Sequence, residues 1–152
     1  MWSLLTLLLS AHVHGEGNLS VAIEKNQLKI EFSIPGDEMP GLKKRPQSEA
    51  DLKIFDAELT KEANEKAWFV LSNKACERKS LQVKTIASGS SGHFDYHREE
   101  LFDCPSGVGE STLQLGFWGA LPAIKKVRVL ILKEQGQKSL VLKPSDSALS
   151  LR

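Results

Sequence analysis

A two-residue period in residues 18–34 sets the first limit on how this chain folds. Apolar side chains occupy every second position on both arms of the segment: Leu19, Val21, Ile23, Leu28, Ile30, Phe32 and Ile34. Polar residues at 25–27 separate the two arms, and Pro35 and Gly36 end the second one. A period of two is typical of a strand with one buried and one wetted face, so the pattern predicts a β-hairpin.

One segment of the chain has the period of a helix instead. Ser48 has the character of an N-cap, and acidic residues follow it in the first turn. Apolar residues then recur at helical spacing: Leu52, Phe55, Leu59 and Ala63. We therefore expect an amphipathic helix over about residues 48–66 that packs one stripe on a sheet.

Several short segments beyond the helix have the composition of strands. They cover residues 68–71, 81–86, 93–102, 112–115, 127–132 and 139–142, with a short helical turn expected at 117–122. Residues 127–132 are the most apolar of these, so we expect them at the centre of the sheet. The predicted fold class is α+β, with a mainly antiparallel sheet of about six or seven strands and one main amphipathic helix.

Composition favours an ordinary globular protein. Apolar residues make up 41% and charged residues 26% of 152 residues, with a formal net charge of +1. Such a chain suits one domain, expected over residues 12–152. Its basic residues are scattered, and the balanced charge argues against a nucleic-acid partner.

The N-terminal residues are apolar and uncharged as far as Ala11. The run is shorter than the roughly 20 residues of a transmembrane helix but has the length of the apolar part of a signal peptide. We therefore expect residues 1–11 to be a signal peptide and the mature chain to begin near His12. A buried N-terminal strand is the alternative, and no other segment is suited to spanning a bilayer.

The chain has two cysteines, Cys76 and Cys104. Their spacing fits neither a CxxC redox pair nor a zinc site with four ligands. In an exported protein such a pair predicts a structural disulfide. Two buried free thiols are the alternative if the chain is not exported.

Potential metal ligands occupy alternate positions of one predicted strand: His93, Asp95, His97 and Glu99. Alternation would place these side chains on one face of the strand, with Phe94 and Tyr96 toward the core. Imidazole and carboxylate groups suit zinc, copper or nickel. Neighbours on one face lie about 6.6–6.8 Å apart along the backbone, so two of them can reach one ion but all four cannot. The alternative is a polar face turned to solvent.

A second group of potential ligands lies at the expected mature start. His12, His14 and Glu16 have the pattern H-x-H-x-E, which could chelate a metal together with the α-amine. Signatures of catalysis are missing: the sequence has no G-x-S-x-G elbow, no HExxH and no phosphate loop. We therefore do not expect an enzyme.

Several short segments, in order and spacing, are similar to a known family. They are residues 14–23, 28–36, 93–104, 116–129, 136–137 and 142–144. With these segments the chain resembles the ZrgA-like family of zinc-regulated periplasmic proteins. The resemblance implies a periplasmic protein that binds zinc and assists its acquisition, handing the metal to a zinc uptake transporter.

The resemblance also assigns residues. It implies that Cys76 and Cys104 are the family's disulfide pair. His93, Asp95, His97 and Glu99 match one metal-binding motif of the family, and His14 matches its N-terminal histidine. Two departures reduce the expected metal capacity: residues 88–92 replace a long loop rich in His and Asp, and Glu16 replaces a second histidine.

The leading hypothesis is therefore an exported, periplasmic zinc-binding protein, with His93, Asp95 and His97 as the first ligands. Neutral imidazoles bind the ion, so the affinity is expected to fall below about pH 6. The competing hypothesis is a disulfide-bridged structural or interaction module of the cell envelope that binds no metal.

Overall fold

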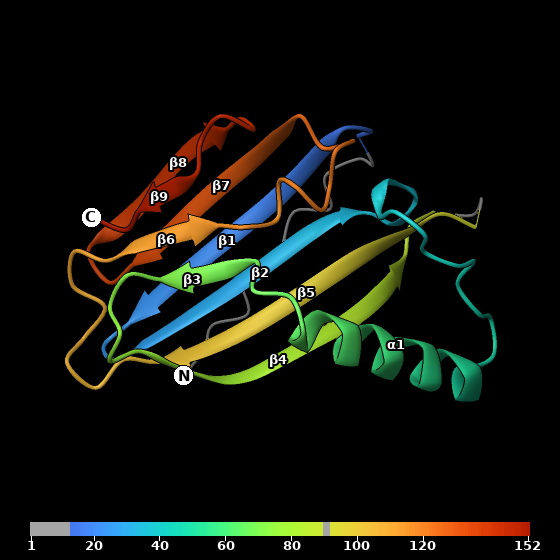
Figure 1. Ribbon diagram of the computed structural model, residues 1–152, viewed down its shortest axis with the longest axis horizontal. Coiled ribbons are helices and arrows are strands. Elements are labelled where there is room, and N and C mark those ends of the chain that lie inside the picture. The colour runs from blue at the N-terminus through green and yellow to red at the C-terminus, as the bar shows by residue number, and fades with distance from the viewer. Residues whose placement is uncertain (1–12, 90–91) are drawn as a thin grey trace.

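A computed structural model of the chain describes residues 13–89 and 92–152 (Figure 1). The strands are β1 (Glu16–Glu24), β2 (Gln27–Pro35), β3 (Phe69–Leu71), β4 (Glu77–Ala87), β5 (Phe94–Asp103), β6 (Thr112–Leu115), β7 (Lys126–Lys133), β8 (Gly136–Leu142) and β9 (Ala148–Ser150). The helical elements are the short 3-10 helix η1 (Gly36–Glu38) and α1 (Glu49–Asn64). In this part of the chain no helix is long and apolar enough to cross a membrane. The predicted signal peptide and His12 lie outside the described residues.

Six strands form the large sheet, in the order β4-β5-β2-β1-β7-β8. Every neighbouring pair is antiparallel except β1 and β7, which are parallel. The predicted fold class is confirmed, with one helix and mostly strands. Residues 127–132 lie in β7, an inner strand of the sheet with β1 on one side and β8 on the other, one place from the edge.

The predicted hairpin is formed by β1 and β2. Their register brings Glu24 opposite Gln27, so only Lys25 and Asn26 form the connection. Lys25 has a φ of 51°, a backbone conformation that two-residue hairpin loops require. The apolar positions of both arms turn to the same side, where Leu19, Val21 and the apolar residues of β2 are buried.

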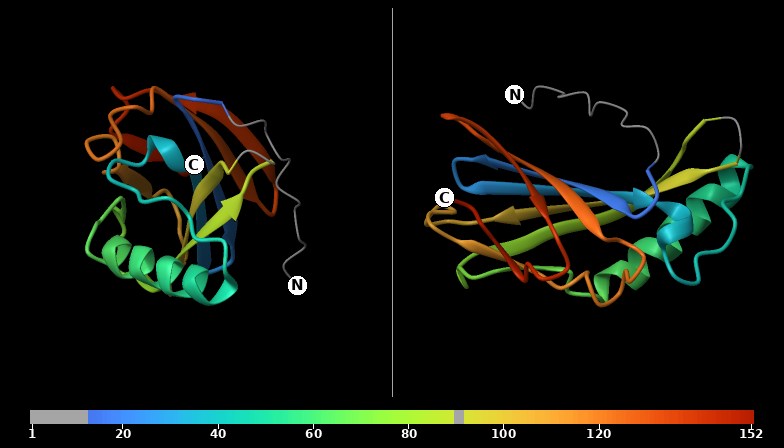
Figure 2. Two further views of the ribbon diagram at one scale, coloured as in Figure 1. Left: turned by 90° about the vertical axis from the view of Figure 1, so that its right-hand side faces the viewer. Right: turned by 90° about the horizontal axis from the view of Figure 1, so that it is seen from above.

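A small antiparallel sheet, in the order β3-β6-β9, and helix α1 lie over one face of the large sheet (Figures 1 and 2). The strand β9 was not predicted. Residues 117–121 form the expected helical turn, in which the Phe117 carbonyl accepts hydrogen bonds from the amides of Ala120 and Leu121. Aromatic rings fill the space between the sheets: the ring of Phe32 lies 6.1 Å from Trp68, 5.6 Å from Phe69 and 4.7 Å from Phe117. We call this the inner face of the large sheet, and the opposite face the outer face.

Helix α1 is capped by Ser48, whose hydroxyl accepts a hydrogen bond from the Asp51 amide as predicted for an N-cap. It packs against β4 with Leu59 and Ala63 buried. A polar contact sets the position of the helix along β4: the Thr60 hydroxyl accepts a hydrogen bond of 2.9 Å from the Val83 amide. The helix thereby covers the edge of the inner face.

The inner face of β5 carries a buried ion pair, Arg98 and Glu100, both fully buried. The carboxylate of Glu100 accepts a hydrogen bond from Arg98 Nε at 2.6 Å and also faces Arg78. The guanidinium of Arg98 donates to the Lys66 carbonyl at 2.9 Å and stacks on Trp68, with its carbon 4.8 Å from the ring centroid. The pair therefore ties β5 to the segment that leaves α1.

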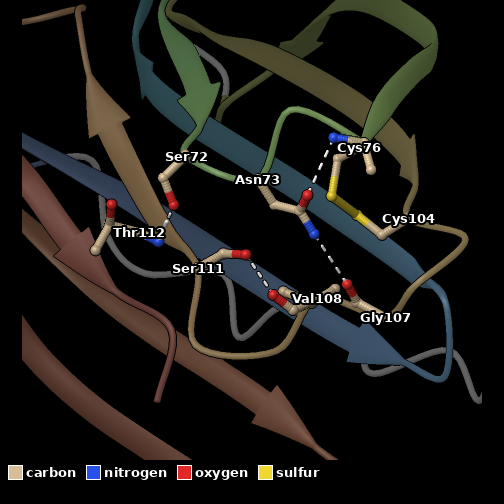
Figure 3. The surroundings of a disulfide bond; sticks show 9 residues. Ser72, Asn73, Cys76, Cys104, Gly107, Val108, Ser111 and Thr112 are labelled. Carbon is tan, nitrogen blue, oxygen red and sulfur yellow. Dashed lines mark hydrogen bonds between the residues drawn. A yellow bond between two sulfur atoms is a disulfide. The ribbon is translucent and has the colours of Figure 1, made fainter.

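A disulfide joins Cys76 to Cys104 and so closes the open end of the hairpin formed by β4 and β5 (Figure 3). Asn73 lies beside it, donating its side-chain amide to the Gly107 carbonyl at 3.2 Å. The Cys104 amide donates a hydrogen bond to the backbone carbonyl of Asn26, in the turn between β1 and β2. The predicted disulfide is confirmed, and it connects the edge of the large sheet to the loops at that end.

Removing the disulfide should lower the stability of the fold. The linked residues are 28 apart in sequence, and a loop of this size predicts a loss of roughly 3–4 kcal/mol in unfolding free energy for Cys76→Ala/Cys104→Ala. Urea denaturation with and without reductant measures the loss. Reductant should destabilise the wild type but not the variant, and equal stability of the two proteins would contradict the prediction.

Neutralising Glu100 should also destabilise the fold, because it leaves the Arg98 charge buried without its carboxylate. We expect Glu100→Gln to lose about 3–5 kcal/mol. The matched control is Glu99→Gln, one residue away on the outer face, where a partly exposed ion pair contributes about 1 kcal/mol or less. Urea denaturation of both variants tests this difference, and losses of the same size would show that the buried pair has no special role.

Candidate metal centre

The outer face of β5 pairs with the outer face of β2 and gathers three potential metal ligands. The antiparallel register places Glu31 directly opposite Glu99, and Ser33 opposite His97. One carboxylate oxygen of each glutamate and one imidazole nitrogen lie within 4.8 Å of one another. Such a set of His and Glu side chains is a common ligand set for zinc.

His97 has one nitrogen bonded within the protein and the other turned to the carboxylates. Its Nδ1 lies 2.9 Å from the Ser33 hydroxyl, and its Nε2 lies 3.9 Å from Glu31 Oε1. When Nδ1 carries the proton and donates it to Ser33, the lone pair of Nε2 points toward the site of an ion. In metal sites, a hydrogen bond from the ring nitrogen that does not bind the ion orients the histidine in this way.

Burial lowers the pKa of His97, and the nearby cations Lys29 and Lys84 lower it further. The carboxylates of Glu31 and Glu99 act in the opposite direction but do not cancel these effects. The imidazole is therefore neutral at pH 7, the protonation state that binds a metal.

Lys29 occupies the position between the two carboxylates. Its Nζ lies 3.3 Å from Glu31 Oε1 and 3.2 Å from Glu99 Oε2. Burial alone would lower the pKa of Lys29, but the two carboxylates raise it above its ordinary value. The ammonium therefore compensates one of the two negative charges when no ion is bound, and a divalent cation would compete with it.

The predicted ligands on β5 do not all join this group. His97 and Glu99 do, as expected for neighbours on one face. Asp95 lies one position further along, paired with Pro35 and Ile86, and neither it nor His93 belongs to a group of three ligands within the described residues.

The predicted N-terminal group is divided in the structure. The imidazole of His14 lies 3.2 Å from Glu38 and 3.5 Å from Asp37, at the end of β2. Glu16 instead pairs with Lys126 and Arg128 of β7, and the hydrogen bond from Lys126 is the main reason that the pKa of Glu16 is lowered. His14 and Glu16 thus have different partners.

Sequence reasoning missed Glu31. The two-residue period of residues 28–34 already places Glu31 on the wetted face of its strand, with Lys29 and Ser33. What was missing was the pairing of β2 with β5, which brings Glu31 beside His97 and Glu99.

Comparison with known protein families gives a match over nearly the whole chain. A family model described as "ZrgA family zinc uptake protein" matches residues 11–151, and the chain therefore belongs to this family. The family is described as one of zinc uptake. No curated protein matches the chain.

The lowered pKa of His97 predicts how the stability of the metal-free protein depends on pH. The folded state favours the neutral imidazole. The contribution of His97 to the unfolding free energy is therefore complete above the ordinary histidine pKa of 6.5, and it is lost as the pH falls through the lowered pKa. Chemical denaturation in EDTA, from pH 7.5 to pH 5, measures it. The unfolding free energy should fall more for the wild type than for His97→Gln, and parallel profiles would contradict the assignment.

Proposed function

We propose that this chain binds zinc through Glu31, His97 and Glu99 outside the cytoplasm and passes the ion to a zinc uptake transporter. One observation carries the proposal: two strands distant in sequence bring three zinc-ligand groups within 4.8 Å in a chain that belongs to a zinc uptake family. Zinc is cargo in this account, held until a partner accepts it.

The ligand set suits a site that exchanges its ion. Structural zinc sites have four protein ligands, whereas three ligands leave a coordination position open. An acceptor can use this position to bind the ion before the protein releases it. Two carboxylates and one imidazole also hold zinc less firmly than thiolates, which are the softer ligands.

Exposure of the ligands supports the same conclusion. The side chain of His97 is 14% exposed, that of Glu31 26% and that of Glu99 41%. His97 is thus held firmly while Glu99 is accessible from solvent. An ion would have protein beneath it and an accessible side above it, where a transporter or a carrier could approach.

The proposed compartment is the periplasm. The Cys76–Cys104 disulfide supports it, because such bonds persist in oxidising compartments and are rare in the cytosol. The apolar residues 1–11 would be the signal peptide, and residues 12–152 would be the mature single domain.

A second function has one specific observation in its favour. Lys29 already bridges both carboxylates and compensates one of their two negative charges without a metal. A structural or interaction module that kept the family fold and binds no zinc would look like this. Zinc titration separates the two functions.

Titration calorimetry of the mature protein at pH 7.5 should show one zinc ion bound per chain. Removing a ligand with Glu31→Gln or His97→Ala should weaken binding by about 100-fold or more, a larger effect than the 10- to 100-fold cost of losing a supporting hydrogen bond. The matched controls are Asp95→Asn and His93→Ala on the same hairpin, which should bind as the wild type does. Wild-type affinity in Glu31→Gln would exclude this site.

Lys29→Met should strengthen zinc binding, because the ion would no longer displace an ammonium from the two carboxylates. Two partly exposed ion pairs predict an increase of roughly threefold to tenfold. The same titration measures it, with Lys79→Met as the control because Lys79 forms its ion pair with Glu77 on β4. Unchanged or weaker binding would show that Lys29 does not compete with the metal.

A further inference from the structure

A groove of about 490 Å³ opens on the outer face of the large sheet, directly beside the proposed metal centre. Glu31 and His97 line one end of it, and Leu130 of β7 and Val141 of β8 line the other. Val141 is an exposed apolar residue, with 48% of its surface accessible. The groove is thus polar where the ion would bind, and its far end combines the apolar side chains of Leu130 and Val141 with Arg128 and Ser139.

Short side chains on β1 form the floor of the groove. Ser20 lies opposite Leu130 on one side and opposite Glu31 on the other, and Asn18 lies one row further along. Larger side chains on the flanking strands rise above them. Neighbouring strands lie about 4.8 Å apart, so the groove extends roughly 14 Å from β2 to β8.

The volume of the groove is too large for an ion and its water alone. A water molecule occupies about 30 Å³ in the liquid, whereas sites for small organic molecules have about 300–1,000 Å³. Such sites combine apolar walls with a few polar groups that orient the ligand. This groove has that composition, with the metal centre as the orienting group.

Charge indicates what kind of molecule would fit. Two charged side chains line the groove itself, Glu31 and Arg128, and their charges balance. Zinc would add two positive charges. The loaded groove is therefore complementary to an anion.

We propose that the groove binds a small anionic zinc chelator with an apolar group, together with the ion. One donor atom of the chelator would take the position that Glu31, His97 and Glu99 leave open, and a second donor would make the zinc five-coordinate. Its apolar part would lie over Ser20 against Leu130 and Val141. The inference rests on the proposed zinc function and extends it: the cargo is a zinc complex rather than the bare ion.

A comparison of L-leucine with glycine tests this inference. Both present the same amine and carboxylate to zinc, so as free chelators both compete with the protein for the ion. Calorimetric zinc titrations are run on the mature protein without amino acid and with each amino acid at equal concentration. We expect the apparent zinc affinity to be about tenfold higher in leucine than in glycine, the effect of partly burying one aliphatic side chain.

The variant Ser20→Trp fills the floor of the groove and should abolish the difference between leucine and glycine while zinc alone still binds. Ser80→Trp adds the same bulk on the exposed edge strand β4 and should preserve the difference. Equal affinities in leucine and glycine, with zinc alone bound normally, would overturn the inference and leave the zinc site intact. Absence of zinc binding in the titration without amino acid would overturn the zinc site and the inference together.

The groove could also be the surface on which a second copy of the chain packs. Analytical ultracentrifugation with zinc present, in leucine and without it, tests this outcome. A monomer under all conditions agrees with the inference. A dimer that Val141→Lys dissociates would assign the groove to a second copy and contradict it.

Discussion

The pairing of β2 with β5 is the contact on which both faces of the large sheet depend. On the inner face it places Phe32 beside Arg98 and so joins the aromatic core to the buried ion pair. On the outer face the same register places Glu31 beside Glu99. A shift of one residue would exchange the two faces of β5, burying His97 and exposing Arg98. The stability of the core therefore determines the geometry of the metal centre.

Two features oppose such a shift. The disulfide fixes the end of β5 to the start of β4, and the Cys104 amide is bonded to the turn between β1 and β2. The buried pair of Arg98 and Glu100 adds a directional constraint, because a buried charge separated from its partner is costly. Both features lie away from the outer face, so the ligands can remain accessible on a rigid support.

Local patterns predicted much of this fold. The two-residue period gave the β1–β2 hairpin, the helical period gave α1, and the alternation of β5 correctly placed His97 and Glu99 on one face. The disulfide followed from two cysteines and an expected export. The parallel pairing of β1 with β7 could not be predicted, because strand order depends on packing between distant segments rather than on local pattern. Glu31 was missed for the same reason.

The account centres on an ion held between β2 and β5, and anomalous diffraction at the zinc edge tests it most directly. Crystals of the mature protein grown with one equivalent of zinc should give one peak, about 2.0–2.2 Å from His97 Nε2 and from a carboxylate oxygen each of Glu31 and Glu99. The Lys29 ammonium should have moved away from both carboxylates. A peak beside His14, Asp37 and Glu38, or at the His93 end of the hairpin, with none between Glu31 and His97, would contradict the account.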